Sequence, residues 1–252
     1  MSPDSHAIIL VTPVWNDTDR LRSFAPHLAK ALKAAELDIH WIVADDGSDA
    51  SERARLVELV EEIETWYSPV ELVTVRERSF KGGAIYHAWD QFPEAEWVGF
   101  VDADGAIDGE TTVQLIREAI TMESNGIVIG IREHSSETPV NRKGVRQLSF
   151  HFFRILVRLL TGLQCKDTQC GIKIVAGPLY RKVASTLQER GFVFDVELLA
   201  LLKAHGGELR ECPIPWQEVS GGRIVPWKHA WSMIGGLIRI RRRLRNSRLV
   251  SD

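Results

Sequence analysis

The stretch Trp97-Val98-Gly99-Phe100-Val101 is apolar throughout and runs directly into Asp102-Ala103-Asp104. Such a run predicts a buried strand, and the two carboxylates follow at the point where the strand ends. Paired carboxylates suit Mg²⁺ or Mn²⁺ carrying a diphosphate, although Asp-x-Asp also occurs in ordinary loops and helix caps. A second apolar run, residues 39–43, ends near Asp45-Asp46-Gly47-Ser48. Because ligands of open α/β sheets bind beyond the carboxyl ends of the strands, we expect these acids to share one crevice.

Strands and helices alternate outward from this stretch. The hydrophobic pattern predicts strands at residues 7–14, 39–44, 70–75, 97–101 and 126–131, with helices at 18–36, 51–66, 83–92 and 110–124. The second half is less regular, with a helix at 150–160, a strand at 171–175, a helix at 195–204 and a strand at 208–216. We therefore predict an α/β fold whose central, mostly parallel sheet is flanked by helices. Without a visible linker, residues 1–236 read as one domain and 237–252 as a basic helical tail.

Composition and cysteine usage favour an intracellular globular protein. The chain has 252 residues, 44% of them hydrophobic and 26% charged, which argues against extended disorder. Its three cysteines, Cys165, Cys170 and Cys212, include no metal-ligand pair and suit a reducing compartment. The first residues do not resemble a signal peptide, and the apolar segment 150–160 is too short and too charged to span a membrane. The predicted location is the cytoplasm.

Positive charge is concentrated near the C-terminus. The net charge of the chain is -3, yet residues 219–250 contain eight Lys or Arg residues and no acid. Six of these are arginines interleaved with Leu and Ile: Arg239, Arg241, Arg242, Arg243, Arg245 and Arg248. This pattern predicts docking on an anionic membrane surface, with a solvated helix as the alternative. Nucleic acid is disfavoured as a partner, because no aromatic or glycine pattern of a binding module accompanies the charge.

Several short motifs occur in an order that resembles a known family. They are Thr12-Pro13-Val14-Trp15-Asn16-Asp17, Asp45-Asp46-Gly47-Ser48, Lys81-Gly82-Gly83-Ala84, Asp102-Ala103-Asp104-Gly105-Ala106, Asp167-Thr168-Gln169-Cys170-Gly171, Phe194-Asp195-Val196-Glu197-Leu198-Leu199, and Trp216-Gln217-Glu218-Val219 before Gly221-Gly222-Arg223. The set resembles family 2 glycosyltransferases of the GT-A fold, in particular the polyprenyl-phosphate glycosyltransferases, and most closely the dolichyl-phosphate β-glucosyltransferases. Each motif alone is common, and only the ordered set is specific.

The resemblance implies a nucleotide-sugar site. It assigns donor binding to Pro13, Trp15, Asp17, Asp45, Asp46, Lys81, Asp102, Gln169 and Arg223, and Mg²⁺ or Mn²⁺ binding to Asp102 and Asp104. Two motifs have plainer explanations, because Asp45 to Ser48 also suits a capped turn and the glycines after Lys81 also suit a turn before a helix. Mannosyl relatives carry a glutamine where this chain has Ala106, so UDP-glucose is the preferred donor and GDP-mannose the next.

The implied acceptor is a polyprenyl phosphate, either dolichyl or undecaprenyl phosphate. A phosphate monoester is already anionic near neutral pH, so inverting transfer to it needs no general base. The resemblance assigns acceptor binding to Arg132 and Arg146, with Arg142 as a competitor for the second position. The plainer alternative is that all three are ordinary surface arginines, as most arginines are. Asp195 is assigned to sugar hydroxyls, and it becomes the candidate base if the acceptor is itself a hydroxyl. Arg223 lies on a glycine-flanked loop that suits a lid over the diphosphate.

Close relatives often have a hydrophobic anchor that is not visible here, so we expect peripheral attachment on the cytoplasmic face of the membrane. The apolar side chains of residues 150–160 cover too much of a helix for one buried stripe, and some should face a membrane or a second subunit. Two other functions stay open at this point. One is transfer to a saccharide or small-molecule hydroxyl, and the other is non-enzymatic nucleotide-sugar binding.

Overall fold

A computed structural model describes residues 7–133, 143–216 and 226–250. Its strands are β1 (Ile8–Val14), β2 (Ile39–Asp45), β3 (Val70–Thr74), β4 (Trp97–Val101), β5 (Gly126–Glu133), β6 (Ile172–Ala176) and β7 (Glu208–Pro215). In the described part of the chain they form a seven-stranded sheet in the order β3-β2-β1-β4-β6-β5-β7. Strand β6 runs antiparallel to both of its neighbours, whereas the other paired strands are parallel. The prediction of a mostly parallel sheet is confirmed.

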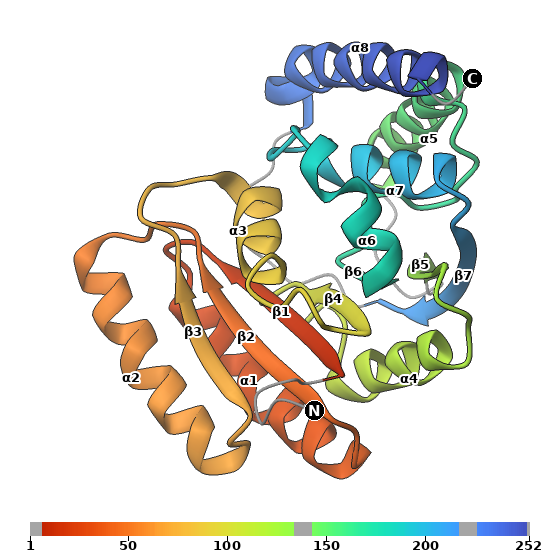
Figure 1. Cartoon of the computed structure of the whole chain (residues 1–252). Coiled ribbons are helices and arrows are strands. Elements are labelled where there is room, and N and C mark those ends of the chain that lie inside the picture. The colour runs from red at the N-terminus through yellow and green to blue at the C-terminus, as the bar shows by residue number, and fades with distance from the viewer. Residues whose placement is uncertain (1–6, 134–142, 217–225, 251–252) are drawn as a thin grey trace.

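Helices surround this sheet (Figure 1). They are α1 (Thr18–Ala35), α2 (Ala50–Trp66), α3 (Phe80–Trp89), α4 (Gly109–Ile120), α5 (Lys143–Thr161), α6 (Gly177–Val183), the 3-10 turn η1 (Ala184–Thr186), α7 (Phe194–Ala204) and α8 (Pro226–Val250). Helix α1 contacts α2 and α4, α3 packs against β1 and β2, and α8 contacts α5 and α7. Figure 1 shows α8 beside α5 and α7, at the end of the molecule away from α2.

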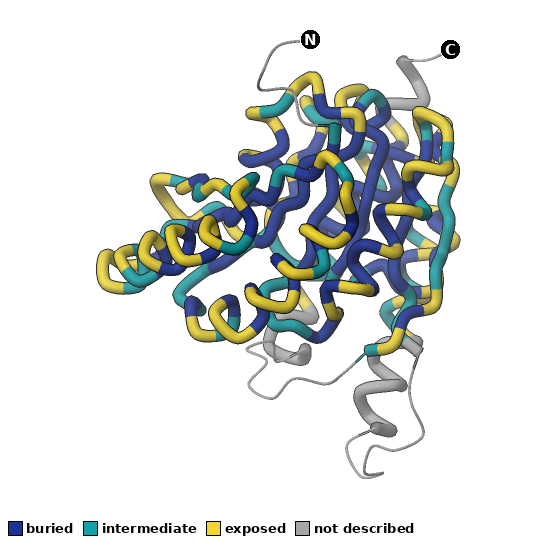
Figure 2. The backbone as a smooth tube through the Cα atoms, turned by 90° about the horizontal axis from the view of Figure 1, so that it is seen from below, coloured by how far each residue is buried: buried dark blue, intermediate teal, exposed yellow. Residues whose placement is uncertain are grey.

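The core is built on the central strands. All residues of β4 and β6 are buried, and Figure 2 shows buried strands enclosed by helices whose outer turns are exposed. Continuous apolar runs form central strands because both faces of the sheet are covered by helices, which removes the alternation seen in one-sided sheets. None of the helices in the described ranges combines the length with the apolar character that a bilayer span requires.

Four helices differ from the expected pattern. Helix α3 begins at Phe80, so Lys81 and the two following glycines lie inside its first turn instead of in a turn before it. Helix α5 begins at residue 143, earlier than expected, and the short helix α6 was not predicted. Helix α8 spans 25 residues, so the expected boundary at residue 237 falls inside it. Its Leu237, Ile240 and Leu244 are buried in the main core.

Candidate functional site

The acidic residues after β4 lie at the carboxyl edge of the sheet. The backbone N–H of Asp102 donates to the carbonyl of Gly171, which fixes the end of β4 against the residue before β6. The Asp102 carboxylate forms an ion pair with Lys81 of α3, with 2.6 Å between Oδ1 and Nζ. Burial lowers the pKa of Lys81, but Asp102 and Asp195 outweigh this effect and raise it above its ordinary value. A charged lysine is therefore held beside the acidic pair.

Asp104 is the second carboxylate of this edge. Its Oδ1 accepts a hydrogen bond from the Ala106 N–H at 3.0 Å, which turns the loop toward α4. The pKa of Asp104 is raised by burial and then by the negative charge of Asp102. A cavity of about 210 Å³ adjoins Asp104 and is lined on its other side by residues of α1, among them Phe24 and His27.

The chemistry of Asp102 and Asp104 fits a hard divalent cation. The two carboxylates are partly buried and repel each other, and a bound cation would offset this repulsion. Among the residues whose side chains are described, no group of three or more His, Cys, Asp or Glu gathers as a ready metal site. Mg²⁺ is commonly bound through one or two carboxylates with phosphate and water as the remaining ligands, so two aspartates suffice when a diphosphate is present.

Lys173 is a buried cation that the sequence analysis did not identify. It lies on β6 opposite Phe100 of β4, is fully buried, and places Nζ 2.6 Å from Asp195 Oδ1. Its ammonium also donates to the carbonyl of Cys170 at 2.9 Å. Burial raises the pKa of Asp195, and Lys173 and Lys81 oppose that rise. A lysine among the apolar residues of a central strand is the signal that could have identified it, because buried lysines require a partner.

The acids after β2 are held by the protein itself. Asp45 is fully buried and accepts from the Ser48 N–H at 2.9 Å and from Arg53 Nε at 3.1 Å. Asp46 accepts from both the N–H and the hydroxyl of Ser79, just before α3. Burial raises the pKa of Asp46, and the bonds from Ser79 oppose this rise. Asp45 thus stabilises its own turn, whereas Asp46 connects that turn to the start of α3.

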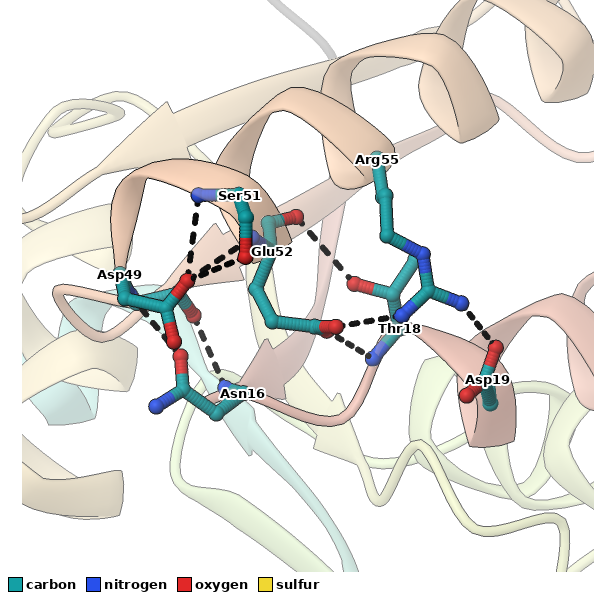
Figure 3. A network of polar contacts seen from close by, with 8 residues as sticks. Asn16, Thr18, Asp19, Asp49, Ser51, Glu52 and Arg55 are labelled. Carbon is teal, nitrogen blue, oxygen red and sulfur yellow. Dashed lines mark hydrogen bonds and ion pairs between the residues drawn. The ribbon is translucent and has the colours of Figure 1, made fainter.

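The loop after β1 is tied to the start of α2 (Figure 3). Asn16 donates its N–H to the Ser48 hydroxyl, and its side-chain oxygen accepts from the Asp49 N–H, both at 2.9 Å. Glu52 accepts from the Thr18 N–H at the start of α1. Arg55 then joins Glu52 to Asp19. The loops that follow β1 and β2 are therefore held in fixed relative positions.

Several predicted donor-site residues lie around these loops. Pro13 is in β1, and Asp17 directly precedes α1 and forms an ion pair with Arg20 at 3.5 Å. The guanidinium of Arg78 stacks 3.3 Å above the Trp15 ring. Trp15 and Arg78 thus stack a cation on an aromatic ring near Asp46, whose pKa burial raises in spite of the opposing charge of Arg78.

Arg132 lies near the end of β5 and forms an ion pair with Asp167. Its Nε and one Nη donate to the two carboxylate oxygens of Asp167 at 2.6 and 2.9 Å. Asp167 also accepts from the Gln169 N–H, and Gln169 Nε2 donates to the Phe192 carbonyl. Burial lowers the pKa of Arg132, but Asp167 and, more weakly, Asp102 raise it. Arg132 is therefore close enough to Asp102 for their charges to interact.

The remaining predicted residues cannot be placed as side chains. Arg146 lies within α5, but its side chain is outside the described residues, as are Arg142 and Arg223. The structure thus brings together Asp102, Asp104, Lys81, Asp195 and Arg132, and it adds Lys173 to them.

Comparisons with known proteins give a consistent result. The model of the family Glycosyl transferase family 2 matches residues 9–185. A dolichyl-phosphate beta-glucosyltransferase of Dictyostelium discoideum is 28% identical over 94% of this chain and 75% of its own length. The enzyme of the same name from Saccharomyces cerevisiae is 26% identical over 92% of this chain and 73% of its own length.

Solved structures share the fold at low sequence identity. Mannosyl-3-phosphoglycerate synthase from Rubrobacter xylanophilus superposes with a TM-score of 0.67 at 15% identity, covering 96% of this chain and 75% of that chain. A mannosyltransferase from Pyrobaculum calidifontis, solved with GDP-Man and Mn²⁺, gives a TM-score of 0.56 at 14% identity. The match covers 92% of this chain and 61% of that chain. The observed architecture is that of GT-A glycosyltransferases, as predicted.

Proposed function

Because this chain belongs to glycosyl transferase family 2, we propose that it transfers glucose from UDP-glucose to a polyprenyl phosphate, with inversion at C1. The observation that carries this proposal is the similarity to dolichyl-phosphate beta-glucosyltransferases over more than nine-tenths of the chain. The geometry agrees with it, since acids suited to a metal-bound diphosphate and a cation suited to a phosphate face one region of the sheet edge.

On the donor side, we assign the nucleoside to the loops that follow β1 and β2. Asp46 suits a base or ribose hydrogen bond better than Asp45, because Ser48 and Arg53 use both oxygens of Asp45, whereas both bonds from Ser79 go to one oxygen of Asp46. Trp15, with Arg78 stacked on its ring, would form one wall of the base site, and Pro13 and Asp17 flank it. Asp102 and Asp104 would hold Mg²⁺ or Mn²⁺, which supplies positive charge to the leaving diphosphate. Lys81 adds a second positive charge, Gln169 is assigned to the sugar, and Arg223 to the diphosphate.

On the acceptor side, Arg132 would bind the phosphate, with Arg146 as the second cation. An anionic phosphate oxygen attacks C1 on the face opposite the diphosphate. A C1–O–P bond forms, the bond from C1 to the diphosphate oxygen breaks, and its electron pair leaves with UDP. No proton has to be removed from the attacking oxygen, which has already lost it near neutral pH. The task of the protein is then to position two anions in line and to stabilise the leaving group.

Arg132→Lys tests the acceptor assignment. Lysine keeps the charge beside Asp167 but loses the planar fork of donors, so kcat/KM for the acceptor should fall about 10- to 100-fold. The Kd of UDP, measured by calorimetry, should stay within about twofold of the parent value, because Arg132 is not assigned to the donor. The matched control is Arg210→Lys, because Arg210 of β7 forms a surface pair with Glu118 of α4, and it should leave both constants unchanged. Weakened UDP binding with normal acceptor saturation would move Arg132 to the donor side.

We also propose that α5 and α8 form the surface that meets the membrane. Phe152, Ile155 and Leu159 of α5 are exposed, as are Trp231 and Ile238 of α8, and the two helices contact each other. This group, called the α5–α8 surface below, is accompanied by the exposed cations Arg154, Arg158, Arg242 and Arg245. Exposed apolar side chains rimmed with arginine suit an interface with anionic lipid. Three free cysteines, two of them buried, agree with the cytoplasmic face.

Vesicle sedimentation checks this surface. Binding to vesicles that contain anionic lipid should weaken as salt rises, because the arginine contribution is screened. The double variant Phe152→Ser/Leu159→Ser should bind at least about tenfold more weakly, since each side chain contributes roughly 1.5–3 kcal/mol when buried. Val57→Ser, at an exposed apolar position of α2, is the control and should bind normally. Equal binding by all three proteins would assign membrane contact to another surface.

Labelled donors and acceptors test the function itself. Wild-type protein with Mg²⁺ or Mn²⁺ should transfer label from UDP-glucose, and much less from GDP-mannose, to a short water-soluble prenyl phosphate. The corresponding prenol, which lacks the phosphate, should receive none. Transfer to the prenol or to a free saccharide would support the hydroxyl-acceptor alternative, and nucleotide binding without any transfer would support the non-enzymatic one.

A further inference from the structure

Helix α8 is joined to the protein by a group of four charged residues. Two of the arginines expected at the membrane, Arg239 and Arg243, instead pair with Glu189 and Glu197. Arg239 makes a two-pronged contact with Glu189, with both N–O distances at 2.8 Å. Arg243 places Nε 2.7 Å from Glu197 Oε1 and donates from an Nη to Glu189 at 2.7 Å. These four residues are called the α8 clamp below.

The clamp holds the backbone of the segment before α7. The second oxygen of Glu197, Oε2, accepts from the N–H groups of Gln188 and Glu189 at 2.8 and 2.6 Å. Glu197 is fully buried, so its charge needs these donors together with Arg243. One carboxylate thus connects an arginine of α8 to two backbone amides of residues 188–189.

Helix α8 also presses directly on this segment. A Cβ on Gly236 would lie 2.4 Å from a methyl carbon of Val193, so only glycine permits the observed approach. The buried Leu237, Ile240 and Leu244 anchor the same face of α8 in the core. Residues 188–195 are therefore fixed from the α8 side by both charge and packing.

The other side of the same segment touches the proposed active site. The Arg190 carbonyl accepts from the Gly82 N–H, next to Lys81, and the Phe192 carbonyl accepts from Gln169 Nε2. A Cβ on Gly82 would lie 2.6 Å from the Phe194 ring, so α3 approaches the segment as closely as α8 does. The segment continues into Asp195, the partner of Lys173. These contacts reach Gln169 and Asp195, which are assigned to the sugar, and Gly82, which adjoins Lys81.

We propose that Arg239 and Arg243 are positioning residues for transfer, which hold residues 188–195 so that Lys81, Gln169 and Asp195 keep their places. Because α8 also carries part of the α5–α8 surface, the clamp couples the position of the membrane-facing helix to the active site. The proposal rests on the proposed function for its effect on catalysis, but the clamp itself can be measured without any acceptor.

The kinetic test uses a short water-soluble prenyl phosphate without vesicles, so that membrane binding plays no part. Arg243→Gln should lower kcat about 3- to 30-fold, with the Kd of UDP unchanged, at a temperature where thermal unfolding shows the variant to be fully folded. Arg243→Lys should recover part of the loss. Glu197→Gln keeps an oxygen for the two amides, and combining it with Arg243→Gln should lower kcat no further than the more severe single change. Lys182→Gln, at an exposed cation of neighbouring α6, should match the wild type.

Hydrogen–deuterium exchange provides the second, acceptor-independent readout. In Arg243→Gln the amides of Gln188, Glu189 and Gly82 should exchange faster, whereas Lys182→Gln should leave them unchanged. If the two variants show these exchange differences but the wild-type protein transfers no glucose, the proposed function is overturned and the clamp is kept. Active wild-type protein with unchanged exchange and kcat in Arg243→Gln would overturn the clamp and keep the function.

Discussion

Asp104→Asn should lower kcat for glucose transfer by about 10²–10³-fold or more, the largest effect expected from one substitution in this chain. The asparagine oxygen can still accept the Ala106 N–H, so the loop after β4 keeps its main internal bond. What disappears is the charge that would hold a divalent cation on the diphosphate. Initial rates with Mn²⁺, and calorimetric titration of UDP with and without the metal, measure the two consequences.

The expected titration result is specific to the metal. UDP affinity of the wild type should increase when Mn²⁺ is added, and that increase should be lost in Asp104→Asn. Asp49→Asn is the control, because Asp49 caps α2 and asparagine caps helices equally well. Near-normal transfer by Asp104→Asn would show that the acidic pair does not carry the metal-dependent step.

Lys173→Met should destabilise the protein by about 3–5 kcal/mol, since it leaves Asp195 buried beside β6 without its closest cation. For a chain of this size that corresponds to roughly 2–4 °C in Tm for each kcal/mol. Thermal and urea unfolding measure the loss. The double variant Lys173→Met/Asp195→Asn should recover much of this stability, because the uncompensated charge is gone, yet it should not recover transfer.

The loss of stability in Lys173→Met should depend on pH in a defined direction. Burial already raises the pKa of Asp195 in the folded protein, and removal of Lys173 raises it further. A carboxyl with a raised folded pKa binds more protons when folded, so its contribution to stability falls as pH rises above the unfolded pKa of about 3.9. The difference between wild type and Lys173→Met should therefore be larger at pH 7 than at pH 4. A difference that stays constant with pH would place the cost in packing instead of charge.

The fold was predictable because the strands carry continuous apolar runs. Strands β1, β2 and β4 begin and end within about two residues of their predicted limits, since each run is bounded by turn or acidic residues. The start of α3 was not predictable, because Phe80 adopts a positive φ of 63° and the two glycines after Lys81 read as a turn. Gly82 packs closely against Phe194, more than 100 residues later, and the local sequence carries no sign of this contact.

The candidate site was predictable only where the sequence shows charge at strand ends. Asp102 and Asp46 follow their strands directly and Asp104 lies two residues after Asp102, so their edge of the sheet could be inferred. Lys173 was missed because its partner, Asp195, belongs to another motif and meets it only in the folded chain. The pairing of Arg239 and Arg243 with Glu189 and Glu197 was missed for the same reason, since regular spacing on α8 shows a basic helix but not which side faces the protein.

The most direct measurement of the central claim is the linkage in the product. Wild-type protein, UDP-glucose labelled with ¹³C at C1, and a short prenyl phosphate give a product that ¹H, ¹³C and ³¹P nuclear magnetic resonance can define. The account predicts a phosphodiester in which the labelled C1 couples to phosphorus and has the β configuration. A labelled C1 without coupling to phosphorus, with the prenyl phosphate unchanged, would contradict it.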